Sequence, residues 1–236
     1  MKLFFIGNSI TKGEIGESYI ELLKMEHPNW IINNAGINGD TLKNISYRLE
    51  RQNNLITNYD YIIIEAGLND IILPYFNNMD PLFRLALKYL LKKGRQPLDI
   101  NNFKKEYERI IKYVQGKSNA KIILTTLSSI NENLQSNLNA IRKRYNETII
   151  QVANQNNCLL ADVSVQFDAI IKNSNQTNYL LENFFASTYF DKKNTQKPEG
   201  SDKLSKNRKL ALTIDGVHLN TRGAKIYKEI IEKLLE

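Results

Sequence analysis

The sequence predicts an α/β protein with a three-layer α/β/α sandwich, in which helices cover both faces of one parallel sheet. Two observations support this fold class. Short apolar runs alternate with longer helical patterns, which implies right-handed crossovers between parallel strands. The runs are also continuous, as expected for strands buried on both faces. The length of 236 residues suits one domain over residues 1–236.

Five apolar runs are the expected strands. They are LFFIG, WIINNAG, YIIIEAG, KIILTTL and CLLADV, at residues 3–7, 30–36, 61–67, 121–127 and 158–163. Helical patterns lie between them, at residues 16–26, 40–52, 102–116 and 137–156. The segment 224–236 is expected to form a last amphipathic helix. Its apolar stripe consists of Tyr227, Ile230, Ile231 and Leu234.

Two long segments interrupt this rhythm, at residues 71–100 and at about 168–212. The first is partly apolar, whereas the second joins an aromatic stretch to a lysine-rich one. Long connections in a compact domain are usually functional or mobile. The first segment is therefore either a packed extra helix or a lid or acyl-binding wall above a site. Aromatic residues of the second segment would complete this lid or wall from the opposite side; they are Tyr179, Phe184, Phe185, Tyr189 and Phe190.

The charge and the cysteine content indicate no special partner. The net charge is +7, but the lysines are scattered apart from a loose cluster over residues 192–209, so a solvated surface is favoured over a nucleic-acid site. Cys158 is the single cysteine, which excludes an intramolecular disulfide and indicates a small core residue. The amino terminus lacks the pattern of a signal peptide, and no run approaches the length of a membrane span. The sequence therefore predicts a soluble, cytoplasmic protein without stable membrane insertion.

Polar and glycine residues follow the predicted strands at their carboxyl ends, where parallel sheets bind ligands. The first strand is followed by Gly7-Asn8-Ser9, the second by a segment ending in Asn38-Gly39-Asp40, and the third by Gly67-Leu68-Asn69-Asp70. The motif Asp215-Gly216-Val217-His218 stands just before the last helix. All four segments are expected to meet at one edge of the sheet.

These residue types suit acyl transfer. A serine hydroxyl becomes a nucleophile when an imidazole takes its proton, and a carboxylate orients that imidazole. Ser9, His218 and Asp215 supply these groups, whereas His27 is most simply a helix C-terminal cap. The backbone N–H groups of Ser9 and Gly39 and the amide of Asn69 would stabilise the oxyanion. Alone, Ser9 would be interpreted as a helix N-cap; together with the DGVH motif it is interpreted as a nucleophile.

The four motifs, in this order and at these strand ends, resemble the GDSL family of SGNH hydrolases. The resemblance covers essentially the whole chain. It implies a flavodoxin-like fold and a serine esterase or lipase that needs no metal or organic cofactor and acts on a small-molecule ester. It assigns Ser9 as nucleophile, His218 as base and Asp215 as its orienting acid, with Gly39 and Asn69 in the oxyanion hole. Gly36 fits that hole less well, because the family's glycine precedes the Asp-Thr pair.

One position departs from the family pattern, which usually has Gly-Asp-Ser where this chain has Asn8. The usual acid is not a triad member, so catalysis is expected to survive. Asp70 is expected to brace a loop. Phosphate-loop and dinucleotide fingerprints are missing, and the two histidines give no metal-ligand spacing.

Three functional alternatives remain open at this point. The chain is either a lipase-like or lysophospholipase-like acyl-esterase, a carbohydrate O-acetylesterase, or a non-catalytic binding module on the same fold. The sequence does not specify an oligomeric state.

Overall fold

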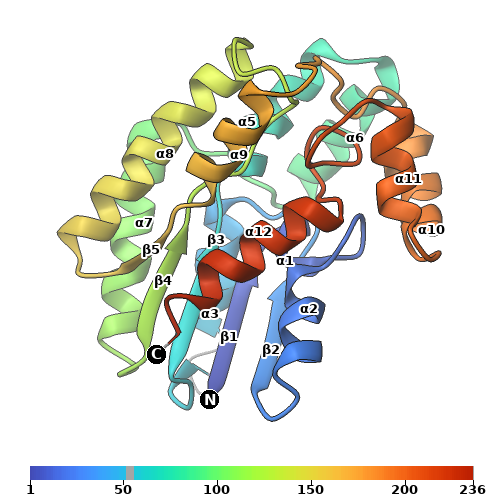
Figure 1. The fold of residues 1–236 in the computed structure, drawn as a ribbon. Helices are drawn as coiled ribbons and strands as arrows, with labels where there is room; N and C mark the ends of the chain where they lie inside the picture. Colours follow the sequence, from blue (N-terminus) through green and yellow to red (C-terminus); the bar gives the residue numbers. More distant parts are fainter. Residues whose placement is uncertain (52–55, 236) are drawn as a thin grey trace.

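The computed structural model describes residues 1–51 and 56–235, which build a five-stranded parallel sheet with helices on both faces (Figure 1). The strands follow the order β2-β1-β3-β4-β5 across the sheet. They are β1 (Lys2–Gly7), β2 (Ile31–Gly36), β3 (Tyr61–Glu65), β4 (Lys121–Thr125) and β5 (Leu159–Ala161). Every neighbouring pair is parallel. The predicted fold class is therefore confirmed, and each strand coincides with one of the predicted runs.

The strands differ in burial according to their place in the sheet. All residues of β3 are buried, and so are all residues of β1 after Lys2, as their apolar sequences predict. The expectation of burial on both faces was wrong for β5, in which only Ala161 is buried, and for β2, in which only Gly36 is buried. The reason is their place at the two edges of the sheet, and in β2 two polar side chains take specific partners. Asn33 donates to the Tyr59 hydroxyl, and Asn34 donates to the Thr11 carbonyl.

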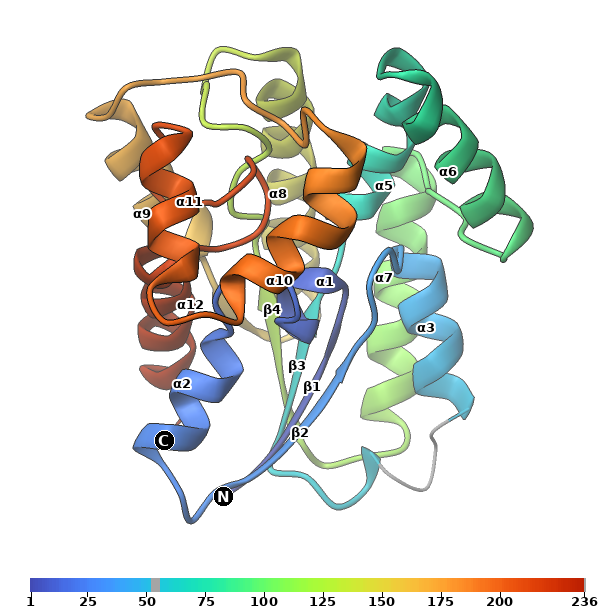
Figure 2. The ribbon, with the colours of Figure 1, turned by 90° about the vertical axis from the view of Figure 1, so that its right-hand side faces the viewer.

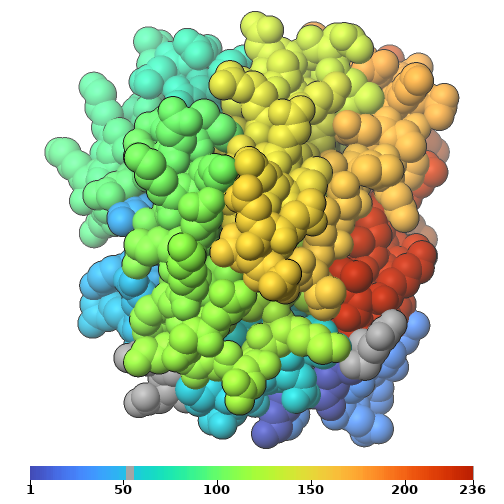
Figure 3. Space-filling model, turned by 90° about the vertical axis from the view of Figure 1, so that its left-hand side faces the viewer, coloured from blue at the N-terminus to red at the C-terminus, as the bar shows by residue number. Residues whose placement is uncertain are grey.

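The helices form one layer on each side of the sheet (Figure 2). One layer contains α2 (Tyr19–Glu26), α9 (Val163–Lys172) and α12 (Thr221–Glu232). The other contains α3 (Leu42–Arg51), α7 (Ile100–Gln115) and α8 (Asn137–Gln155), and α7 and α8 cover the face shown in Figure 3. Apart from α9, which was not predicted, these helices match the predicted ones. The expected ends at residues 52 and 236 lie outside the described residues.

Capping residues explain where several helices begin. Ser18 accepts a hydrogen bond from the Glu21 N–H, so α2 starts at Tyr19 rather than at residue 16. Asp99 caps α7, Ser136 caps α8 and Asn220 caps α12 in the same manner. Among the described residues, none of the helices combines the length and the apolar composition that crossing a membrane requires.

Both insertions contain helices at the carboxyl edge of the sheet. Residues 71–100 include most of α5 (Leu68–Tyr75), the 3₁₀ turn η1 (Phe76–Asn78) and the amphipathic α6 (Pro81–Lys92). The expected start of the second insertion at residue 168 was wrong, because α9 continues to Lys172. Beyond it lie the π-helical turn η2 (Ala186–Phe190), α10 (Asp191–Thr195) and α11 (Gly200–Asn207).

Candidate active site

The four predicted motifs meet beyond the carboxyl ends of β1, β2 and β3. These three ends are level, because Gly7 pairs in register with both Gly36 and Glu65. One pocket of about 330 Å³ lies above them. Its wall includes the predicted residues Ser9, Gly39, Asn69 and His218.

A chain of hydrogen bonds joins the serine, the histidine and the aspartate. His218 Nε2 lies 3.1 Å from Ser9 Oγ, and His218 Nδ1 lies 2.6 Å from Asp215 Oδ2. Both members of the His–Asp pair are buried. Burial alone would lower the pKa of His218, but the charge of Asp215 and the hydrogen bond to it raise that pKa above its ordinary value. The imidazole is therefore held by the carboxylate on one side and faces the serine hydroxyl on the other.

The turn that carries Asp215 and His218 is closed by its own hydrogen bonds. Asp215 Oδ1 accepts from the N–H groups of Val217 (3.0 Å) and His218 (2.8 Å), so this side chain both shapes the turn and contacts the ring. Gly216 has φ = +90°, a conformation that favours glycine. Burial opposes ionisation of Asp215, but His218 and these backbone donors hold the pKa of the carboxyl below its usual value.

A second buried acid, Glu132, holds the residues that directly precede the Asp215 turn. Its carboxylate accepts from the N–H groups of Leu212 (2.9 Å) and Thr213 (2.8 Å) and from the Thr213 hydroxyl (2.8 Å). It is fully buried. Glu132 was not among the predicted site residues, because an acid in a polar loop gives no signal that its side chain is buried.

Ser9 is the first residue of the one-turn helix α1 (Ser9–Lys12). The N-cap of this helix is Asn8, whose Oδ1 accepts from the Ile10 N–H at 2.8 Å. The interpretation of Ser9 as a cap is therefore wrong, and its hydroxyl faces His218. As the first residue of α1, Ser9 also has a backbone N–H without a partner inside that helix.

The other two predicted oxyanion donors lie on the neighbouring loops. Gly39 has φ = +77° and sits in a turn closed by a bond from the Asp40 N–H to the Ile37 carbonyl. Asn69 Nδ2 donates to the Asp40 carbonyl at 2.9 Å, which leaves its second N–H for the pocket. Gly36 has a packing role instead, since a Cβ there would lie 2.3 Å from the Lys12 nitrogen.

Asp70 braces two loops behind the pocket, as expected. Its carboxylate accepts from the N–H groups of Leu42 (3.0 Å) and Leu98 (2.9 Å). Burial raises the pKa of Asp70 to about 7, although these two donors favour its ionised form.

Arg48 also holds the loops of the site in place, and it was not among the predicted residues. It donates to Asp40 (2.7 Å) and to the carbonyls of Ala35 (2.6 Å) and Gly7 (3.1 Å). It therefore joins the ends of β1 and β2 to the loop of Gly39. A single arginine on an amphipathic helix indicates only a solvated face, so no sequence signal marked it.

The insertions supply an apolar wall. Pocket residues from the first insertion are Ile72, Leu73, Phe76, Phe83, Ala86, Tyr89 and Leu90. From the second they are Leu181, Ser187 and Thr188, so the expectation that the aromatic residues 179–190 line the wall was wrong. Phe184 instead packs edge-to-face on Phe83, with ring centroids 5.2 Å apart. Tyr179 stacks on Arg208.

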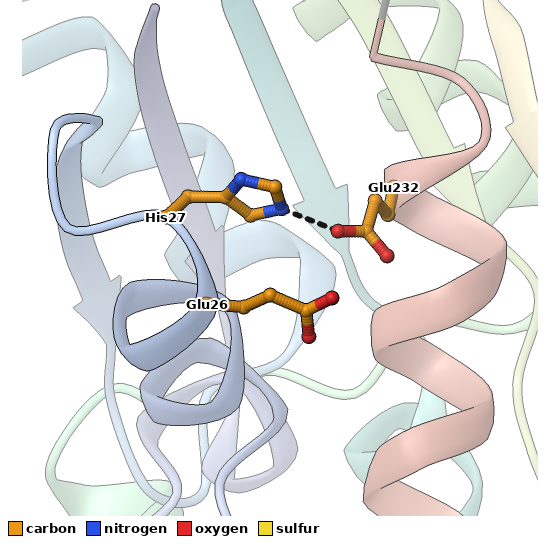
Figure 4. Close-up of side chains that lie close together, drawn as sticks. All are labelled: Glu26, His27 and Glu232. Atoms are coloured by element: carbon orange, nitrogen blue, oxygen red, sulfur yellow. Dashed lines mark hydrogen bonds and ion pairs between the residues drawn. The ribbon is translucent and has the colours of Figure 1, made fainter.

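A separate cluster at the opposite end of the sheet involves His27, which occupies the expected C-cap of α2. Its ring pairs with Glu232 and stacks on Trp30, and Glu26 lies close by (Figure 4). His27, Glu26 and Glu232 offer three potential metal ligands within 4.8 Å, a juxtaposition that the sequence analysis missed. Lys228 already pairs with both glutamates, however, so the cluster is an ion-pair network that ties α2 to α12.

Comparisons with known proteins identify the family and the fold. The sequence model of the GDSL-like Lipase/Acylhydrolase family matches residues 5–226. An acetylxylan esterase of Geobacillus stearothermophilus is 28% identical over 192 residues, which are 72% of this chain and 80% of that protein. The crystal structure of the acetyl xylan esterase AlAXEase shares the fold, with a TM-score of 0.68, 20% identity and 100% coverage of both chains. LAE5, a hydrolase from the metagenome of Lake Arreo in Spain, has a TM-score of 0.65, 19% identity and coverage of 98% and 93%.

Proposed function

The chain belongs to the GDSL-like lipase/acylhydrolase family and is a hydrolase of ester bonds, and we propose that Ser9 is its nucleophile. The observation that carries this proposal is the hydrogen-bonded chain from Asp215 through His218 to Ser9, with distances of 2.6 and 3.1 Å. In this mechanism His218 Nε2 takes the Ser9 proton as Oγ attacks the ester carbonyl. Asp215 fixes the ring orientation and stabilises the imidazolium that forms.

The attack of Ser9 Oγ produces a tetrahedral intermediate, which then breaks down to the acyl-enzyme. The carbonyl oxygen becomes an oxyanion that accepts from the N–H groups of Ser9 and Gly39 and from the Asn69 amide. His218 gives its proton to the leaving alcohol, and the acyl group stays on Ser9. A water molecule, deprotonated by His218, attacks the acyl carbon and forms a second tetrahedral intermediate. As this breaks down, the bond to Ser9 Oγ is cleaved, His218 gives its proton to Oγ and the carboxylic acid leaves.

The substrate that we propose is an O-acetylated carbohydrate. The support for this choice is the name of the relative at 28% identity, an acetylxylan esterase. The second candidate is an ester with a longer acyl chain, favoured by the apolar wall that Phe76, Phe83 and Leu90 form beside Ser9. An apolar pocket of 330 Å³ exceeds what an acetyl group needs.

Two experiments test this proposal. A fluorophosphonate probe should label the wild-type chain at Ser9 and leave Ser9→Ala unlabelled, while that variant keeps the wild-type unfolding midpoint. An unreactive Ser9 in the wild type, or turnover that survives in Ser9→Ala, would contradict the proposal, and the first result would favour a binding module. A series of p-nitrophenyl esters from acetate to octanoate, measured beside acetylated xylooligosaccharides, separates the two substrate candidates.

A further inference from the structure

A buried glutamate lies directly under the turn that carries Ser9. Glu65 ends β3 beside Gly7, and it is 1% exposed. Its carboxylate accepts hydrogen bonds from a residue of α1 and from the N-cap of that helix. Oε1 accepts from Asn8 Nδ2 at 2.8 Å, and Oε2 accepts from Thr11 Oγ1 at 3.1 Å and from the Asn8 N–H at 3.3 Å. The carboxylate therefore contacts both ends of the short helix that positions the serine.

Asn8 connects this acid to the helix because its amide has two polar ends. Its NH₂ donates to Glu65, while its Oδ1 accepts from the Ile10 N–H. An ionised aspartate at position 8 would keep the bond to Ile10 but would place a second carboxylate against Glu65. Two acids that share a buried site cannot both ionise, so one would have to bind a proton. An amide at position 8 and an acid at position 65 thus fit each other.

The surroundings of Glu65 leave these donors as its main stabilising partners. Within residues 1–51 and 56–235, no lysine, arginine or histidine forms an ion pair with it. The ionisable groups that interact with its charge are the hydroxyls of Tyr19, Tyr107 and Tyr227, from α2, α7 and α12. Burial raises the pKa of Glu65 to about 7, and the bonds from Asn8 and Thr11 oppose that rise. The carboxylate is therefore most stable when the turn keeps this conformation.

Gly7 is part of the same arrangement. A Cβ at this position would lie 2.1 Å from Thr11 Oγ1 and 2.9 Å from Glu65 Oε2. The glycine thus leaves the space in which the carboxylate and the threonine hydroxyl meet.

We propose that Glu65 and Asn8 act as an interdependent positioning pair, in which the acid of β3 holds the nucleophile turn through the asparagine amide. The proposal rests on the proposed role of Ser9, and it gives the amide at position 8, where the family pattern has an acid, a specific partner in this chain. Neither residue touches the reacting atoms, so both act through the position of Ser9. The effect of a substitution at position 8 should therefore depend on which residue stands at position 65, and the reverse.

A reciprocal exchange tests this pairing. The variants are Glu65→Gln, Asn8→Asp and the double variant Asn8→Asp/Glu65→Gln, in which the acid and the amide change places. Glu106→Gln is the matched control, since Glu106 is also a buried acid but pairs with Arg109 on α7. The readouts are the rate of Ser9 labelling by a fluorophosphonate, kcat and KM for p-nitrophenyl acetate, and the unfolding midpoint in urea.

We expect each single variant to slow labelling and kcat about 10- to 100-fold, with KM little changed, because small displacements of a nucleophile have effects of this size. The double variant should recover to within about 3-fold of wild type, because the carboxylate introduced at position 8 can accept both from the amide introduced at position 65 and from the Ile10 N–H. Thr11→Val removes one donor to Glu65, together with the 3.3 Å contact of the Thr11 hydroxyl with the Tyr19 hydroxyl, and gives a milder test if a single acid or amide exchange unfolds the chain. It should slow labelling about 3-fold.

Wild-type labelling rates in the folded single variants would overturn the pairing. So would a double variant whose labelling rate falls by the product of the two single-variant factors. If a single exchange unfolds the chain, a wild-type labelling rate in Thr11→Val would overturn it instead. A failure of the proposed function is distinguishable from these. In that case the wild type itself would not be labelled at Ser9, or Ser9→Ala would keep its turnover.

Discussion

The loops at the strand ends and the two insertions differ in how they build the pocket. The loops bring polar groups together, and buried acids fix them: Glu65 under the serine, Glu132 and Asp215 under the histidine. The insertions contribute apolar side chains and leave others open to solvent, with Leu85 64% and Phe185 56% exposed. Hydrogen bonds are directional and costly to leave unmade, whereas apolar contacts tolerate changes of shape. We infer that the loops determine the chemistry and the insertions determine which acyl group is accepted.

The two insertions also depend on each other. Phe83 of α6 packs on Phe76 at 5.0 Å and on Phe184 at 5.2 Å between ring centroids. Phe184 thus joins the second insertion to the wall of the first. By contrast, the loops are tied directly to the sheet, because Arg48 donates to the carbonyls at the ends of β1 and β2. Changes in the loops should therefore alter all substrates alike, and changes in the wall should separate them.

The largest effect is expected for Asp215→Asn. The asparagine oxygen can still accept from the Val217 and His218 N–H groups, but its NH₂ would then face His218 Nδ1 and favour the wrong tautomer. We expect kcat to fall about 10⁴-fold for every ester, with the unfolding midpoint close to that of wild type. Steady-state kinetics and urea unfolding check this prediction. Asp162→Asn, at the end of β5 and outside the pocket, is the control and should keep its activity.

A smaller loss is expected for Asn69→Ala, which removes one proposed oxyanion donor. Such a donor contributes about 10²- to 10³-fold in kcat, or about 3–4 kcal/mol. Because the donor acts on the transition state of every ester, acetate and longer esters should lose activity by the same factor. Asn33→Ala removes a side-chain amide on β2 and should have no such effect. If kcat fell by different factors along the ester series, the loops would also be selecting the acyl group, which would contradict the proposed difference between the loops and the wall.

The pH dependence provides the next test of the polar half of the pocket. The base must be neutral to accept the Ser9 proton, so kcat/KM should fall about tenfold per unit as the pH drops below the pKa of His218. Burial alone would lower that pKa, but Asp215 raises it, so we expect the fall to begin above pH 6.5. Glu65 has a pKa of about 7 and lies close to the turn, so the profile is repeated with Glu65→Gln. A fall that vanishes in that variant would assign it to Glu65 instead of His218.

The difference between the polar loops and the apolar insertions also explains what the sequence could predict. Continuous apolar runs identified the five strands. Short motifs after three of them identified Ser9, Gly39 and Asn69, and the motif before the last helix identified Asp215 and His218; the structure places these residues together. Glu132 escaped notice because the burial of an acid in a polar loop depends on distant donors that no local pattern reveals. Glu65 lies within the predicted strand 61–67, but its partners Asn8 and Thr11 are 57 and 54 residues away in the sequence. The wall was only partly predicted. Aromatic composition suggested Phe185 and Tyr189 as lining residues, but the backbone of the second insertion turns Leu181 and Thr188 toward the pocket instead.

The smallest and most selective effect is expected in the wall, for Leu90→Ala. Leu90 lines the pocket, whereas its neighbour Leu91 is 47% exposed and does not line it, so Leu91→Ala is a matched control on the same helix. Removal of the Leu90 side chain takes away apolar contact that an acyl chain beyond acetyl would make, at a cost of about 1–2 kcal/mol. We expect kcat/KM for the hexanoate to fall about tenfold, and that for the acetate to change less than about 2-fold. If both esters lost activity equally, the wall would be supporting the catalytic loops rather than selecting the acyl group.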